Sequence, residues 1–113
     1  MRRAIAPLLL LAGCAVGDPP DDLAGHVYPA ECTVAAAIAE PASRIAIDPA
    51  ILETMSEQFN KRELGLWLPP LNGGPATIFY DETARGWELA DIQRHEGCHQ
   101  IRYRLTGDAR WHK

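Results

Sequence analysis

Two histidines and a glutamate stand close together near the end of the sequence, in the segment His95-Glu96-Gly97-Cys98-His99. On an α-helix, residues four apart lie one turn apart on the same face, so the imidazoles of His95 and His99 can converge on one divalent metal ion. The carboxylate of Glu96 can then reach a water molecule on the metal without ligating the metal itself. This spacing predicts a hydrolytic zinc site in which Glu96 is the general base.

The third ligand of this predicted site has to come from the end of the chain. Residues 100–105 contain neither His nor Glu, which leaves Asp108 and His112 as candidates. Because Gly107 allows the chain to turn back after a helix, either residue can return to the metal. We expect His112, because neutral imidazole is a common zinc ligand, and keep Asp108 as the alternative metal ligand. A frayed, solvated tail is the structural alternative for His112.

One long helix is expected to present these side chains. The pattern predicts a helix from about Trp87 to Leu105, ended by Thr106-Gly107 with Gly107 in the left-handed C′ position. On a helical wheel, one third of the circumference carries the His and Glu side chains, an apolar stripe follows, and a narrow polar strip remains. Such a helix suits the lining of a cleft. The three sets are Glu88, Ile92, His95, Glu96, His99 and Tyr103; Trp87, Ala90, Cys98, Ile101 and Leu105, with Arg94 as the one charge inside this stripe; and Gln93, Gly97, Gln100 and Arg104.

The rest of the chain supplies shorter elements on which this helix can pack. An Ala-rich stretch predicts one helix, an Asp-Pro pair predicts the start of another, and β-branched and aromatic residues predict strands. The expected fold class is α+β: a small domain with a short antiparallel or mixed sheet and the long helix at its centre. The expected elements are helices at 32–40 and from 48 onward, and strands at 44–47 and 76–80.

The first residues have the pattern of an export signal. A positive Met1-Arg2-Arg3 precedes a short apolar run and the segment Leu11-Ala12-Gly13-Cys14, which resembles a bacterial lipobox. The resemblance implies that Cys14 becomes a lipidated N-terminus, held at the membrane by about 0.8 kcal/mol per buried CH₂. In a Gram-negative host, Ala15 after Cys14 implies the periplasmic face of the outer membrane. A plain secretory signal is the alternative.

These patterns divide the chain into a signal peptide (1–13), a lipidated N-terminus with a flexible tether (14–31) and a folded domain (32–113). Residues 15–31 contain three Pro, two Gly and an acidic cluster, which is typical of a tether, and His26 is expected to be solvated there. With Cys14 acylated, Cys32 and Cys98 remain. They form either a disulfide, which an oxidising compartment permits, or two separate buried thiols.

Composition limits the partners. The chain has 113 residues, 47% of them hydrophobic, and a formal net charge of −4. Loss of residues 1–13 would lower Lys plus Arg from 11 to 9 against 15 acidic residues, giving −6. This balance disfavours nucleic acid as a partner and leaves no basic patch for a membrane surface, so lipid would have to provide the anchor. No apolar stretch is long enough to span a bilayer.

The HExxH helix and, loosely, the strand before it resemble the zincin metallopeptidases, in particular their minimal members. The resemblance implies Zn²⁺, peptide or amide hydrolysis, and an edge strand that pairs with extended substrate. An exported enzyme of this kind would act on an envelope protein or a peptidoglycan peptide. The rival hypothesis is a non-catalytic, lipid-anchored binding or inhibitory module, with no metal or with a closed structural site that includes Cys98. The expected substrate strand comprises Ala76, Thr77, Ile78, Phe79 and Tyr80.

Overall fold

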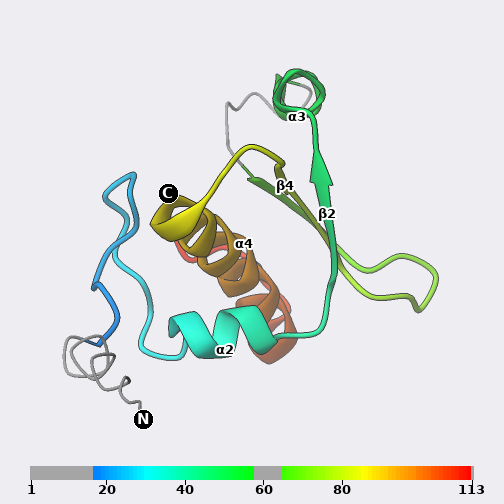
Figure 1. Ribbon diagram of the computed structural model, residues 1–113. Coiled ribbons are helices and arrows are strands. Elements are labelled where there is room, and N and C mark those ends of the chain that lie inside the picture. The colour runs from blue at the N-terminus through cyan, green and yellow to red at the C-terminus, as the bar shows by residue number, and fades with distance from the viewer. Residues whose placement is uncertain (1–16, 58–64, 113) are drawn as a thin grey trace, which may run out of the picture.

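The order of helices and strands places one long helix at the end of an α+β fold (Figure 1). The computed structural model describes residues 17–57 and 65–112. Within this part of the chain, no helix is both long and apolar enough to cross a membrane. The order of the elements confirms the α+β class and the long helix that the sequence predicts. The elements are α2 (Val34–Ala39), β2 (Ser43–Ile47), α3 (Pro49–Glu57), β3 (Gly65–Leu68), β4 (Thr77–Asp81) and α4 (Gly86–Thr106).

The three strands form a mixed sheet in the order β2-β4-β3. β2 runs parallel to β4, and β3 runs antiparallel to it. The edge position expected for residues 76–80 is therefore wrong, because β4 is the middle strand. Its side chains explain this placement: β-branched and aromatic residues suit a strand paired on both sides, and Ile78 is completely buried.

Local chemistry fixes the helix ends. Asp48 accepts a hydrogen bond from the Ala50 N–H at 2.7 Å at the start of α3, as its position before Pro49 predicts. At the end of α4, Gly107 adopts the left-handed conformation (φ 80°), and its N–H donates to the Tyr103 carbonyl. The chain therefore reverses after α4, as the sequence predicts.

The helix α4 lies between two layers, with the sheet on one side and α2 on the other (Figure 1). Two glycines permit this close packing. A Cβ on Gly97 would lie 2.5 Å from the Ala37 carbonyl oxygen of α2, and a Cβ on Gly65 would lie 2.7 Å from Ile92 Cγ2 of α4. Gly97 is thus buried, not on a wet strip as predicted. Gln100 of the same strip is also buried, where it accepts a hydrogen bond from the Trp67 indole at 3.0 Å.

The segment before α2 packs on α4 as part of the domain, so the predicted tether is wrong for residues 17–31. Tyr28 of this segment is buried, and the Arg94 guanidinium lies 3.7 Å from the centre of its ring. Arg94 also donates to the carbonyls of Cys32 (2.6 Å) and Pro19 (2.7 Å). A buried cation with two carbonyl acceptors and an aromatic face explains why one charge interrupts the apolar stripe of the helix.

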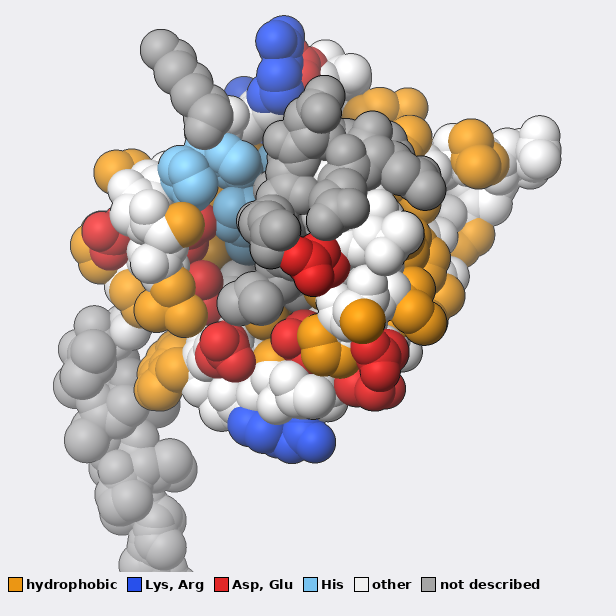
Figure 2. Space-filling model, turned by 90° about the horizontal axis from the view of Figure 1, so that it is seen from above, with side chains coloured by type: hydrophobic (Ala, Val, Ile, Leu, Met, Phe, Trp, Pro, Cys, Tyr) orange, Lys and Arg blue, Asp and Glu red, His pale blue; other side chains and the backbone are white. Residues whose placement is uncertain are grey.

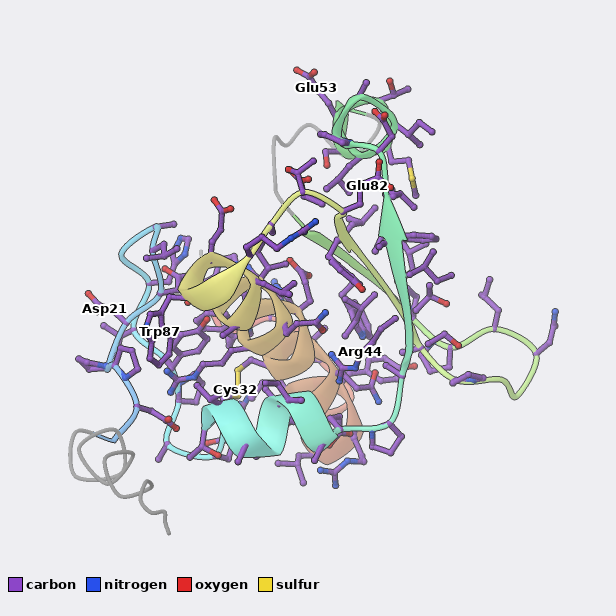
Figure 3. The ribbon with its side chains drawn as sticks, viewed as in Figure 1. Asp21, Cys32, Arg44, Glu53, Glu82 and Trp87 are labelled. Carbon is purple, nitrogen blue, oxygen red and sulfur yellow. A yellow bond between two sulfur atoms is a disulfide. The ribbon has the colours of Figure 1, made fainter. Side chains whose placement is uncertain are left out.

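A disulfide between Cys32 and Cys98 joins the start of α2 to the centre of α4. The two Cα atoms are 5.3 Å apart, and both residues are fully buried. Figure 3 shows the sulfur atoms beside α2, next to the label of Cys32. The sequence left open either a disulfide or two separate buried thiols, and the structure contains the disulfide. It belongs to a buried apolar cluster formed by Tyr28, Cys32, Ala37, Cys98 and Ile101.

Candidate metal centre

Three imidazoles converge beside the middle of α4. His112 Nε2 lies 3.0 Å from His95 Nε2 and 3.3 Å from His99 Nε2. A tetrahedral ion with bonds of about 2.0–2.1 Å holds its ligand nitrogens about 3.3–3.4 Å apart, so these two separations are close to those of ligands on one metal ion. On the face in Figure 2 the His side chains gather in one patch, with acidic side chains nearby. The structure thus brings together the three residues that the sequence predicts as ligands.

Residues 109–112 pack against the domain, so His112 does not lie in a frayed tail. After Gly107 the chain returns along α4, where the Ala109 carbonyl lies 2.8 Å from His99 Nδ1. The Trp111 ring stacks on Tyr28, with ring centres 4.8 Å apart and planes inclined by 20°. This stack anchors the residue next to His112 and thereby holds its imidazole near the other two.

Asp108, the alternative ligand, is used differently. Its exposed carboxylate accepts hydrogen bonds from the backbone and the guanidinium of Arg110, the latter at 2.8 Å. These hydrogen bonds lower the pKa of Asp108 to about 2. The carboxylate is therefore committed to Arg110, and the prediction of Asp108 as a metal ligand is not supported.

The Nδ1 atoms of two of the imidazoles have oxygen acceptors. Asp22 Oδ2 lies 2.7 Å from His95 Nδ1, and the Ala109 carbonyl oxygen faces His99 Nδ1. An ionised carboxylate and a carbonyl can only accept, so Nδ1 carries a proton in each imidazole, and in the neutral ring Nε2 then carries the lone pair. Such outer contacts orient metal ligands and fix their tautomers. Glu88, which the helical wheel places on the same face as His95, is exposed, and Asp22 holds His95 instead.

Asp22 is the functional residue that the sequence did not reveal. It is buried in the segment 17–31, where its Oδ1 accepts hydrogen bonds from the backbone N–H of Ala24 (3.0 Å) and of His26 (2.7 Å). Burial raises the pKa of Asp22, but these bonds and those from the imidazoles of His26 and His95 outweigh it and leave the pKa below its usual value. The carboxylate is therefore ionised at neutral pH.

Glu96 occupies the position that the motif predicts for a general base. Its side chain is buried, and its Oε2 lies 3.9 Å from His95 Nε2. The strand β3 crosses α4 at this point, since a Cβ on Gly65 would lie 3.1 Å from the same carboxylate oxygen. A carboxylate held beside the Nε2 atom of His95 suits proton transfer next to a metal bound there.

A fourth imidazole also belongs to this cluster. The ring of His26 stacks on that of His112, with centres 4.1 Å apart and planes inclined by 24°. The predicted solvated position of His26 is therefore wrong. His26, His95 and His112 each offer one ligand atom, and these atoms lie within 4.8 Å of one another. No local pattern predicts this position, because His26 is separated from the motif by most of the folded domain.

The remaining predicted residues are not part of the centre. Cys98 is bound to Cys32 in the disulfide, so its sulfur is not available for a closed site with His95. Cys14 lies outside the described residues. No family model, no curated protein and no solved structure matches the chain.

Proposed function

We propose that this protein is a zinc-dependent hydrolase of peptide or amide bonds, with His95, His99 and His112 as the metal ligands. The observation that supports this is the convergence of three Nε2 atoms, two of them oriented through Nδ1, beside the buried carboxylate of Glu96. Bound zinc would polarise a carbonyl group and lower the pKa of a water molecule. The resemblance to zincins leads to the same chemistry.

The protein's own groups divide the work. Asp22 and the Ala109 carbonyl hold two imidazoles in the tautomer that presents Nε2. Glu96 accepts the proton of the attacking water and returns it to the leaving amine. Only 3% of Glu96 is exposed, so bulk water has little access to its carboxylate. Neutral imidazole ligands would leave the charge of the metal to act on the substrate.

The substrate would lie along β3 and not along residues 76–80. Within residues 17–57 and 65–112, β3 is paired only with β4, and strand addition would use its other edge. Gly65 of β3 lies against Glu96, and the Trp67 ring lies 6.3 Å from that of His99. An extended peptide hydrogen-bonded to this edge would therefore pass next to both the base and a ligand.

We further propose that the protein acts in the bacterial envelope as a lipoprotein anchored through Cys14. The disulfide Cys32–Cys98 suits an oxidising compartment. The lipobox-like segment and the acidic charge balance suit anchoring by lipid alone. The expected substrates in that compartment are envelope proteins and the peptide part of peptidoglycan.

The test combines metal analysis with turnover. The purified protein is expected to bind one zinc ion, and His112→Ala is expected to lose it. Glu96→Gln should keep the zinc but lose hydrolysis of a peptide library or of peptidoglycan by about 10²–10⁴-fold, because only the general base is removed. Glu88→Gln is the matched control, since Glu88 is an exposed residue of the same helix and should leave both properties unchanged.

Three outcomes would contradict the proposal. A protein that binds no zinc under any condition would lack the proposed centre. A protein that binds zinc but shows no turnover in the wild type would instead be the rival, a binding or inhibitory module with a structural metal site. Equal, measurable turnover in the wild type and in Glu96→Gln would show that Glu96 is not the general base.

A further inference from the structure

The position of His26 allows this residue a role in the metal centre beyond the three predicted ligands. We infer that its imidazole is a fourth, displaceable metal ligand, which closes the coordination sphere in the resting protein and leaves it when a ligand enters. The inference deepens the proposed function, because it requires a metal on His95, His99 and His112. It concerns the fourth coordination position, which a hydrolytic zinc site must keep available.

One carboxylate oxygen is shared by two imidazoles whose ligand atoms lie close together. Asp22 Oδ2 lies 2.7 Å from His95 Nδ1 and 3.1 Å from His26 Nδ1, and His26, His95 and His112 each offer a ligand atom within 4.8 Å of the others. Since an ionised carboxylate only accepts, both rings carry a proton on Nδ1, and each neutral ring then presents the lone pair of Nε2. His26 thus has the same tautomer as the ligand His95. The His26 ring also stacks on the ring of His112, so it lies next to a second proposed ligand.

The backbone around His26 is fixed independently of the imidazole. The Asp22 N–H donates to the His26 carbonyl at 2.8 Å, and the His26 N–H donates to Asp22 Oδ1 at 2.7 Å. An isolated β-bridge joins Asp21 and Val27 on either side of this turn. The loop can therefore keep its shape when the ring changes its rotamer, and also when the ring is removed by substitution.

The ring itself is less restrained than that of His95. The side chain of His26 is 32% exposed, against 14% for His95, and its contact with Asp22 is the longer of the two. A rotation about the side-chain bonds can carry the ring toward solvent, while Asp22 keeps its hydrogen bond to His95. Only His26 among the four imidazoles belongs to the segment 17–31, so the site can open without moving α4 or the C-terminal tail.

The experiment uses the cobalt-substituted protein and azide, a small anion that binds at an open coordination position. In the wild type, His26 competes with azide, so the apparent dissociation constant rises in inverse proportion to the open fraction. If His26 occupies the position more than about nine-tenths of the time, His26→Ala should bind azide at least about tenfold more tightly. The visible spectrum of Co²⁺ before azide addition should also change, because one nitrogen ligand is lost.

Val27→Ala is the matched control, because this neighbouring side chain is exposed and has no ligand atom. It should retain the wild-type spectrum and azide affinity. Equal spectra and equal azide affinities in wild type and His26→Ala, with cobalt bound in both, would overturn the role of His26 and leave the proposed hydrolase intact. Failure of both proteins to bind cobalt or zinc would overturn the proposed function together with this inference.

Discussion

The two sides of α4 are held by different kinds of contact. Toward α2 and the segment 17–31, the helix is joined by the disulfide of Cys98, by the hydrogen bonds of buried Arg94 and by the bond between Asp22 and His95. Toward the sheet, Gly65 of β3 packs closely against Ile92, and side-chain hydrogen bonds join Trp67 to Gln100 and Arg44 to Gln93. One side thus includes a covalent bond, while the other combines close packing with side-chain hydrogen bonds.

Because of this difference, the imidazoles and the Glu96 carboxylate are held in place by different parts of the fold. The side toward α2 and the segment 17–31 orients His95 and, through Tyr28 and Trp111, holds the tail that carries His112. The sheet side determines where the Glu96 carboxylate lies, because β3 crosses the helix there. Changes on the first side should therefore affect metal binding, and changes on the second side should affect turnover.

The largest effect is expected from removal of the disulfide. In the chain-entropy model, a bridge between residues 66 positions apart contributes about 4 kcal/mol, so Cys32→Ala/Cys98→Ala should lower the free energy of unfolding by about that amount. Urea denaturation followed by circular dichroism measures the loss. Added reductant should destabilise the wild type under unfolding conditions and leave the double variant unchanged. A loss below about 1 kcal/mol would show that the polar contacts alone hold this side of α4.

A smaller effect, confined to metal binding, is expected from Asp22→Asn. The amide is a weaker acceptor than the carboxylate and can turn its NH₂ group toward His95 Nδ1, which favours the wrong tautomer. Loss of such an outer contact typically lowers metal affinity about 10–100-fold, and competition with a chelator measures it. Asp21→Asn is the matched control, because Asp21 directly precedes Asp22 in the chain and its side chain is exposed (Figure 3). Equal zinc affinities in the two variants would remove Asp22 from the centre.

The same two sides differ in how much the sequence reveals of them. The face that carries His95, Glu96 and His99 follows from local spacing on a helix, and the return of His112 follows from the turn at Gly107. Asp22 could not be predicted, because its partner His95 lies 73 residues away and its neighbours have the composition of a linker.

A second limit concerns the sheet. The residues of β4 predict a strand, but not that both β2 and β3 pair with it. Strand order depends on contacts between distant segments, which hydrophobic alternation in one segment cannot specify. The charge of Arg94 within the apolar stripe was the one local sign that another segment packs there.

The sheet side is tested most directly by Gly65→Ala. The new Cβ would lie 2.7 Å from Ile92 Cγ2 and 3.0 Å from Glu96 Cγ, so β3 or the Glu96 side chain must shift. Misplacement of a catalytic group by about 1 Å can cost about 100-fold in rate, and we expect kcat to fall between tenfold and about that limit. Zinc affinity should remain within about twofold of the wild type, because the contacts of Asp22 and Ala109 lie on the other support.

Gly74→Ala serves as the control for this change, since Gly74 lies in the exposed loop between β3 and β4 and its added Cβ would lie 3.3 Å from the Leu71 carbonyl. Peptide hydrolysis and chelator competition, measured on the same preparations, separate the two supports. If Gly65→Ala weakened zinc binding as much as Asp22→Asn does, the sheet would also position the ligands. The separation of the two sides would then be wrong, because a shift at β3 would have to reach His95 and His99 through the body of α4.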